Sequence, residues 1–218
     1  MNCLTTLGRT ILPPGFWGDP STAGDTTSAP GKLYLTFDDG PNPSTTPGLL
    51  SLLEAEQVPA TFFLIGQQIA RHRELGKQIV SAGHTVGNHS YQHEFMPGMP
   101  LKRVMEEINQ TNILLEEIAD GNVRKLFRPP YGILDKRIAD CVKEAGMSIV
   151  YWTLVPEDWQ NVGADRIVER VTKKMAPGSV IVLHEGTSIA EQTLGATKQI
   201  ITRAKARGFQ FCPLPDLP

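Results

Sequence analysis

The sequence has little cysteine and no long apolar run, and each absence excludes a class of protein. It has only three cysteines among its 218 residues, Cys3, Cys141 and Cys212, and no two of them lie close together. This spacing excludes a zinc knuckle and a dense disulfide framework. No apolar stretch is long enough to cross a bilayer, so the sequence predicts no transmembrane segment.

The sequence also lacks an excess of basic charge. Lysine and arginine number 21 against 23 acidic residues, which gives a formal net charge of −2. With no basic arm, we expect neither nucleic acid nor an anionic membrane as a partner. Pro13, Pro14 and Gly15 interrupt the N-terminal apolar content, so no secretion signal is visible. Composition indicates neither the oligomeric state nor the location in the cell.

The order of apolar patterns predicts a single α/β domain. Residues 1–30 are rich in Gly, Pro, Ser and Thr and read as an irregular lead-in, followed by a domain over 31–212 and a short tail over 213–218. Apolar runs typical of strands lie at 33–37, 60–65, 84–88, 126–128, 148–153, 180–184 and 209–211. Helical patterns lie at 47–56, 69–82, 101–119, 136–145, 164–175 and 190–207. This alternation predicts a parallel sheet with crossover helices, in a number of units that approaches a barrel.

Reactive side chains gather where the predicted strands end. In parallel α/β folds, functional groups collect at the carboxyl ends of the strands. No glycine-rich phosphate loop opens a helix, which weighs against a nucleotide site. The residues that follow or end a predicted strand are Asp38 and Asp39, His89 and His93, Arg128 and Tyr131, Asp158 and Trp159, and His184. This distribution predicts one site.

Residues 36–41 (TFDDGP) place two adjacent acids at the end of the first predicted strand. Asp-Gly and Gly-Pro are ordinary turn formers, so this segment alone is consistent with a capped turn. At a strand end, however, both carboxylates can bend towards one site. Asp39 could then hold a metal while Asp38 takes a proton.

His89 and His93 are spaced i and i+4, which on one helical turn would point both rings to the same side. Two imidazoles and one carboxylate suit zinc with an open coordination position. We therefore expect Asp39, His89 and His93 to bind a divalent metal, Zn²⁺ first, with Co²⁺ or Ni²⁺ as alternatives.

The remaining strand-end residues can complete a hydrolytic site. Arg128 can fix the carboxylate of Asp38 through a charge-assisted pair. Tyr131 follows two prolines that lack an amide hydrogen, and its own N–H can face a developing oxyanion. His184 is placed to protonate a leaving amine, and Asp158 can hydrogen-bond it. Trp159 can wall the pocket and stack on a sugar, and a core tryptophan is an equal alternative.

Together these motifs closely resemble the polysaccharide deacetylases with a NodB-homology domain, carbohydrate esterase family four. The motifs are T-F-D-D-G-P at 36–41, H-S-x-x-H at 89–93, R-x-P-Y at 128–131 and the strand-ending His184, and the resemblance covers roughly residues 32–211. It implies a distorted, incomplete (β/α) barrel. Departures are Val155 in place of the first acid of D-x-x-D-W, Val182 in place of the leucine of L-x-H, and Glu185 where aspartate is common.

The resemblance implies a role for each matched residue. Asp38 would be the catalytic base, and Asp39, His89 and His93 the metal ligands. His184 would be the general acid, with Arg128 orienting the base and Asp158 supporting the acid. Tyr131 would give the oxyanion donor. Substrate would contact Tyr131, Trp159, Val182 and Leu183.

The implied reaction is hydrolysis of N-acetyl groups on an N-acetylglucosamine polymer, either chitin-type or peptidoglycan, with release of acetate. Hydrolysis of O-acetyl groups on xylan, or of a cyclic amide or ureide, is the alternative. A non-catalytic carbohydrate-binding domain is disfavoured because neither Asp38 nor a metal ligand is missing. The family usually acts at the cell envelope or outside the cell, whereas no export signal is visible here.

Overall fold

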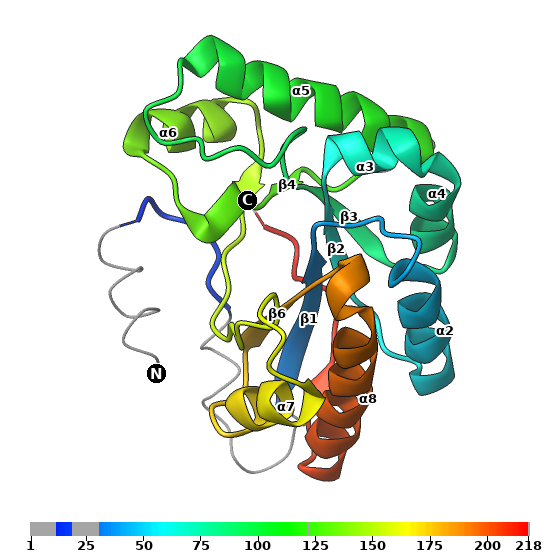
Figure 1. Cartoon of the computed structure of the whole chain (residues 1–218). Helices are drawn as coiled ribbons and strands as arrows, with labels where there is room; N and C mark the ends of the chain where they lie inside the picture. Colours follow the sequence, from blue (N-terminus) through cyan, green and yellow to red (C-terminus); the bar gives the residue numbers. More distant parts are fainter. Residues whose placement is uncertain (1–11, 19–30, 122, 218) are drawn as a thin grey trace.

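In the computed structural model, the described residues 12–18, 31–121 and 123–217 form a parallel sheet surrounded by helices (Figure 1). Every strand pairing in this part of the chain is parallel. The strands are β1 (Lys32–Asp38), β2 (Thr61–Leu64), β3 (Thr85–Asn88), β4 (Leu126–Phe127), β5 (Ser148–Ile149), β6 (Ser179–His184) and β7 (Gln210–Phe211).

The sheet is an incomplete barrel. Its strand order is β5-β4-β3-β2-β1-β6, and β7 pairs with the start of β1. Beyond β5 the chain crosses to β6, where Leu154 and Ile181 form an isolated parallel bridge. Thr153 adds hydrogen bonds to Val180 of β6, so residues 153–154 connect the segment after β5 to the other outer strand of the sheet. The predicted fold class is therefore confirmed.

Helices cover the outer face of the sheet. They are α2 (Thr46–Glu56), α3 (Gly66–Arg71), α4 (Arg73–Ser81), α5 (Leu101–Ile118), α6 (Lys136–Glu144), α7 (Ala164–Thr172) and α8 (Ala190–Ala206), with short 3-10 turns η2 (Pro130–Gly132) and η3 (Thr187–Ile189). In Figure 1, α5 lies across the top of the view and α7 and α8 lie near the bottom. No helix among the described residues is both long and apolar enough to span a membrane.

Strand β1 shows why the sheet forms here. Alternate side chains of a strand point to opposite faces, and a central parallel strand is buried on both. Leu33, Leu35 and Phe37 enter the largest hydrophobic cluster, whereas Tyr34 joins a separate cluster. Apart from Lys32 at the exposed start of the strand and Thr36, whose hydroxyl donates to the carbonyl of Ile181, both faces are apolar up to Asp38, the last residue of β1.

The single helix predicted over 69–82 is wrong, because two helices occupy this region. His72 separates them with φ −130° and ψ 49°, which lies outside the helical range. The carbonyl of His72 accepts hydrogen bonds from the amides of Leu75 and Gly76, so α4 starts anew there. Residues 71–74 are all polar, but they include neither a proline nor a glycine, and for that reason the break was not predicted.

Parts of both predicted terminal segments pack on the domain. Phe16 bridges to Val150, and the ring of Trp17 stacks on Tyr151 with centroids 4.3 Å apart. Leu214 is buried, and Arg124 donates a hydrogen bond of 2.7 Å to its carbonyl oxygen. Residues 1–11 and 19–30 lie outside the described part, so the boundaries of the lead-in remain a prediction.

Candidate active site

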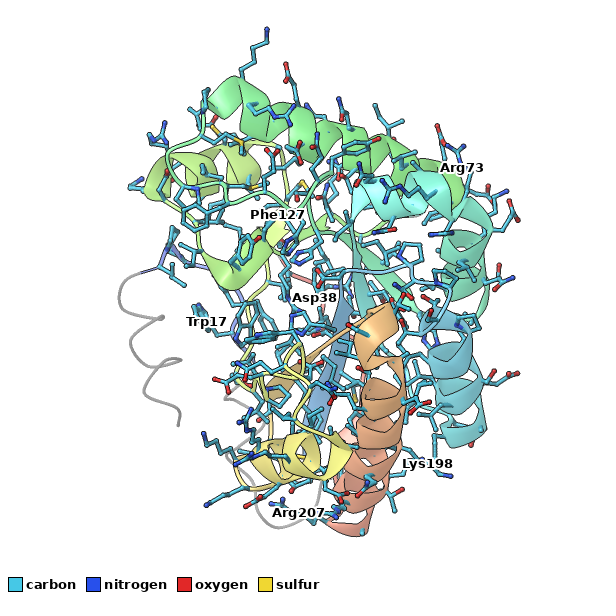
Figure 2. The ribbon with its side chains drawn as sticks, viewed as in Figure 1. Trp17, Asp38, Arg73, Phe127, Lys198 and Arg207 are labelled. Carbon is cyan, nitrogen blue, oxygen red and sulfur yellow. The ribbon has the colours of Figure 1, made fainter. Side chains whose placement is uncertain are left out.

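A cavity of about 310 Å³ opens at the carboxyl ends of the strands. Figure 2 labels Asp38 at this edge, near the middle of the molecule. The lining residues are Asp38, Asp39, His89, His93, Tyr131, Trp152, Trp159 and His184. All of them except Trp152 are site residues predicted from the sequence. Trp152 lies just beyond the end of β5, so the strand-end rule would have found it had that strand been predicted at its true length.

Asp39, His89 and His93 form a donor set that fits a divalent metal. One ligand atom from each lies within 4.8 Å of the others. Asp39 Oδ1 is 3.5 Å from His89 Nε2 and 3.4 Å from His93 Nε2. This oxygen is buried without a hydrogen-bond partner among the described residues. Because an unpaired buried oxygen is unfavourable, the arrangement favours a cation that three ligands can share.

The backbone fixes the tautomer of His89. Its Nδ1–H donates a 2.7 Å hydrogen bond to the carbonyl oxygen of Arg128. The lone pair of Nε2 is then directed at Asp39. Metal-binding histidines typically donate their second ring nitrogen to such an acceptor. His89 is therefore prepared as a ligand through its Nε2 atom.

The histidine pair does not lie on a helical turn, contrary to the sequence-based expectation. Ser90 and His93 both have left-handed backbone angles, with φ 64° and 59°. The segment is a loop, yet it folds so that the two rings lie 4.9 Å apart between centroids. The i, i+4 spacing thus correctly predicted that the two rings are neighbours, but the helical backbone it assumed is wrong.

Asp38 and Arg128 form a buried ion pair. Arg128 Nη1 donates 2.7 Å hydrogen bonds to Asp38 Oδ1 and Thr36 Oγ1, and the rest of the guanidinium donates to the carbonyls of Val150 and Tyr151. Burial raises the pKa of Asp38, but the charges of Arg128 and the nearby histidines outweigh it and hold that pKa below its ordinary value. Asp38 is therefore an ionised carboxylate at neutral pH, able to accept a proton.

His184 is held as a protonated imidazole. Its ring Nδ1 donates to Asp158 Oδ1 at 2.9 Å, and its backbone amide donates to Oδ2 at 2.6 Å. Burial lowers the pKa of His184, but the hydrogen bond and charge of Asp158 outweigh burial and raise it to about 9. Because Asp158 occupies Nδ1, the Nε2–H is the proton that His184 can give to a bound molecule.

The turn after β4 brings Tyr131 to the mouth of the cavity. Tyr131 sits in η2 with a left-handed φ of 60°, and its ring lies 4.8 Å from that of His93. The next residue, Gly132, has φ 69°, and a Cβ there would lie 2.2 Å from the Trp152 ring. Only glycine fits this position, so Gly132 and Trp152 together set the conformation of the turn.

Half-exposed aromatic rings flank the cavity mouth. Trp159 is 50% exposed and meets the His184 ring edge-on at 5.1 Å, which excludes the alternative of a core tryptophan. Phe95 is 53% exposed and lies outside the lining of the cavity, with its ring 6.1 Å from that of Tyr131. Phe95 was not predicted as a site residue, since it follows no strand and belongs to none of the motifs.

Val182 and Leu183 lie inside the sheet. Both have no exposed surface, and they pair with Thr36 and Phe37 of β1. Neither lines the cavity. The expectation that they contact substrate therefore finds no support in the geometry, because sheet pairing and core packing enclose both side chains.

Glu185 packs against the turn that follows Asp38 and Asp39. Its side chain is buried, and a Cβ on Gly40 would lie 1.8 Å from its Oε1 atom. Thr46 donates a hydrogen bond to the other carboxyl oxygen. Burial raises the pKa of Glu185 to about 8. The glutamate that departs from the family pattern thus fills space beneath residues 36–41 and requires glycine at position 40.

Three comparisons relate the chain to known proteins. A family model described as Polysaccharide deacetylase matches residues 25–150. A chitooligosaccharide deacetylase of Bradyrhizobium sp. (strain ANU 289) is 34% identical over 197 residues, covering 85% of this chain and 90% of the relative. A peptidoglycan-N-acetylglucosamine deacetylase of Bacillus cereus is 34% identical over 187 residues, covering 85% and 87%. A crystal structure of a peptidoglycan N-acetylglucosamine deacetylase superimposes with a TM-score of 0.84 at 32% identity, covering 92% and 90%.

Proposed function

Because the chain belongs to the polysaccharide deacetylase family, we propose that it removes N-acetyl groups from an N-acetylglucosamine polymer and releases acetate. One observation carries this proposal. A metal-type donor set, an ionised carboxylate and a protonated histidine face the same cavity. The names of the relatives support chitooligosaccharide and peptidoglycan as the substrate classes.

Asp39, His89 and His93 are the proposed ligands of a divalent metal, with Zn²⁺ as the first candidate because two imidazoles and a carboxylate form a common open zinc site, and with Co²⁺ or Ni²⁺ as alternatives. When bound, such a metal lowers the pKa of water and polarises a carbonyl oxygen. The side chains around it would carry the protons and orient the substrate.

Asp38 is the proposed base. It accepts a proton from the water that attacks the acetamide carbon, and Arg128 holds the carboxylate both ionised and oriented. The oxygen of the acetyl group gains negative charge as the new C–O bond forms. The backbone N–H of Tyr131, at the cavity mouth, is the proposed donor to that oxygen.

His184 is the proposed acid. The C–N bond breaks readily only when the departing nitrogen receives a proton, and His184 Nε2–H supplies it. The pKa of His184 is raised to about 9, which keeps this proton in place at neutral pH. The products are acetate and a free amine on the sugar.

The exposed aromatic rings support a carbohydrate as the substrate. Trp159 lies beside His184, whereas Tyr131 lies beside His93 and has Phe95 as its neighbour. Flat apolar rings with a polar neighbourhood can stack against the faces of sugar rings. An extended glycan across the mouth would thus contact aromatic groups beside His184 and beside His93.

The test is acetate release by the zinc-loaded enzyme from chitooligosaccharides and peptidoglycan, compared with acetylated xylan. We expect release from one or both of the N-acetylglucosamine polymers, with Asp38→Asn protein of the same purity as the control for contaminating activity. Release from xylan alone would replace the proposal with an O-acetyl esterase. Release from none of the three polymers, chitooligosaccharide, peptidoglycan and acetylated xylan, would contradict both.

A further inference from the structure

The loop that carries His89 and His93 is anchored by a carboxylate from α5. Glu107 Oε2 accepts a 3.0 Å hydrogen bond from the amide of Tyr91 and a 2.7 Å hydrogen bond from the amide of Gln92. Glu107 is only 1% exposed. These two amides lie between the two histidines in the chain, so the carboxylate holds the centre of the loop.

Side chains also satisfy the neighbouring amides of this loop. The amide of Ser90 donates to Asn88 Oδ1 at 2.8 Å, and the amide of His93 donates to Ser90 Oγ at 3.0 Å. Because two of its residues are left-handed, the loop is neither helix nor strand. Its buried amides therefore cannot use helix or sheet hydrogen bonds and need other acceptors. Four consecutive amides, from residue 90 to residue 93, are thus held by three side chains.

The opposite side of the loop is fixed by backbone contacts. The amides of Gly66 and Gln67, at the start of α3, donate 2.9 Å hydrogen bonds to the carbonyls of Ser90 and Tyr91. The loop therefore lies between α3 and α5. Among the described residues, Glu107 of α5 is the only charged side chain that accepts hydrogen bonds from the amides of this loop.

Burying the carboxylate of Glu107 is unfavourable unless hydrogen bonds and an opposite charge compensate it. A buried carboxylate must be paired or hydrogen-bonded, and an apolar residue would pack at this helix position without that demand. Glu107 is paired with Arg103 at 3.1 Å, and Arg103 also reaches Glu94 at 3.5 Å. The charge is thus compensated on the outer side, while the inner oxygen points at the loop.

We propose that Glu107 is a positioning residue for the metal site, acting through the amides of Tyr91 and Gln92 on the placement of His89 and His93. The inference rests on the proposed metal site. Removing the two hydrogen bonds loosens the loop, and the ligands then have to be ordered when metal binds. Partners that orient metal ligands typically change metal affinity by about 10–100-fold when mutated.

The experiment measures the zinc dissociation constant of the folded protein by competition with a chromophoric chelator, without substrate. Glu107→Ala should weaken zinc binding by about 10–100-fold. Glu107→Gln keeps a carbonyl oxygen that can accept both amides, and it should bind zinc nearly as tightly as wild type. Glu106→Ala, an exposed neighbour on the same helix, is the matched control and should be unchanged.

Zinc binding by folded Glu107→Ala as tight as that of wild type would overturn the proposal, as would equal losses in the alanine and glutamine variants. If the alanine variant does not fold, Glu107→Asp takes its place, because its shorter side chain cannot reach the loop. Faster hydrogen exchange at the Tyr91 and Gln92 amides together with weaker zinc binding then supports the role, and wild-type values for both contradict it. Because no turnover is measured, a wrong substrate assignment would leave this result unaffected.

Discussion

Two adjacent aspartates in this site have opposite surroundings. Asp38 ends β1, is 1% exposed and is paired with Arg128. Asp39 has a left-handed φ of 74°, and its side chain turns towards His89 and His93. In a regular strand the two carboxylates would point to opposite faces, so the left-handed residue is what brings both to one cavity. The same chemical group is thereby prepared for two different tasks.

Exchanging each aspartate for asparagine separates these tasks. Asp38→Asn should keep zinc and glycan binding, because only the proton acceptor is removed. Its turnover should fall by about 10²–10⁴-fold. Asp39→Asn should instead lose zinc affinity, because a ligand charge is removed. Zinc content by elemental analysis and acetate release by assay distinguish the two. Near-normal turnover in Asp38→Asn would show that the assigned base is wrong.

The hydrogen bond between Asp158 and His184 should set the alkaline limit of activity. The pKa of His184 is raised from 6.5 to about 9, so its protonated form contributes stability below pH 6.5, and this contribution is lost as pH rises towards 9. Asp158→Asn removes the charge that holds the proton and should move the alkaline limb of the pH–activity profile down by about 1 unit or more. An unchanged limb in a folded variant would exclude His184 as the acid.

Phe95 should matter for long substrates only. Phe95→Ala removes one aromatic face beside Tyr131, a contact worth about 0.5–1.5 kcal/mol, so KM for a chitotetraose should rise by about 2–10-fold. Turnover of N-acetylglucosamine monomer should be unaffected. Ile113→Ala, which removes an exposed apolar side chain of α5 that does not line the cavity, is the control. Equal effects of Phe95→Ala on monomer and tetramer would remove Phe95 from the binding surface.

The residues that the sequence did not reveal share a physical reason. Glu107 lies in an amphipathic helix, where a charged residue ordinarily faces solvent. Phe95 lies in a connection without regular pattern. Strand-end motifs identify groups that touch the reacting atoms, whereas these two residues act from neighbouring elements. Their roles depend on which segments meet in space, and local sequence carries no record of that.

At the scale of elements, periodicity predicted the type of nearly every element, and the errors occur where the backbone leaves regular geometry. One predicted helix is two helices separated by His72, and the predicted helical turn of the histidine pair is a loop. The strand predicted over 148–153 ends at Ile149, because the following residues leave β5 and bridge to β6. None of these three breaks contains a proline or glycine that would mark the end of a regular element in the sequence.

Helix α6 follows the turn that carries Tyr131, and its start is fixed by a side-chain cap. Asp135 Oδ1 accepts a 3.1 Å hydrogen bond from the amide of Ile138. Asp135→Ala should lower the free energy of unfolding by about 1 kcal/mol, measured by urea denaturation. Asp140→Ala, which removes only an exposed ion pair with Lys136, should change it by much less. Equal losses in the two variants would mean that the cap contributes nothing of its own.

At the scale of the whole molecule, the site is assembled from the carboxyl ends of several strands of the sheet. Asp38 ends β1 and Asp39 follows it, the histidine pair follows β3, Arg128 follows β4, and His184 ends β6. Parallel pairing places all of these ends at one edge of the sheet (Figures 1 and 2). For this reason the sequence could predict which residues meet, although the distances and the left-handed turns had to come from the structure.

The central claim is that this chain is a metal-dependent deacetylase of N-acetylglucosamine polymers. It is tested most directly by acetate release from chitooligosaccharides with the protein as purified, after chelator treatment, and after zinc is returned, with metal content measured at each step. The account predicts release that disappears with the metal and returns with zinc. Undiminished release from protein shown to be free of metal would contradict it.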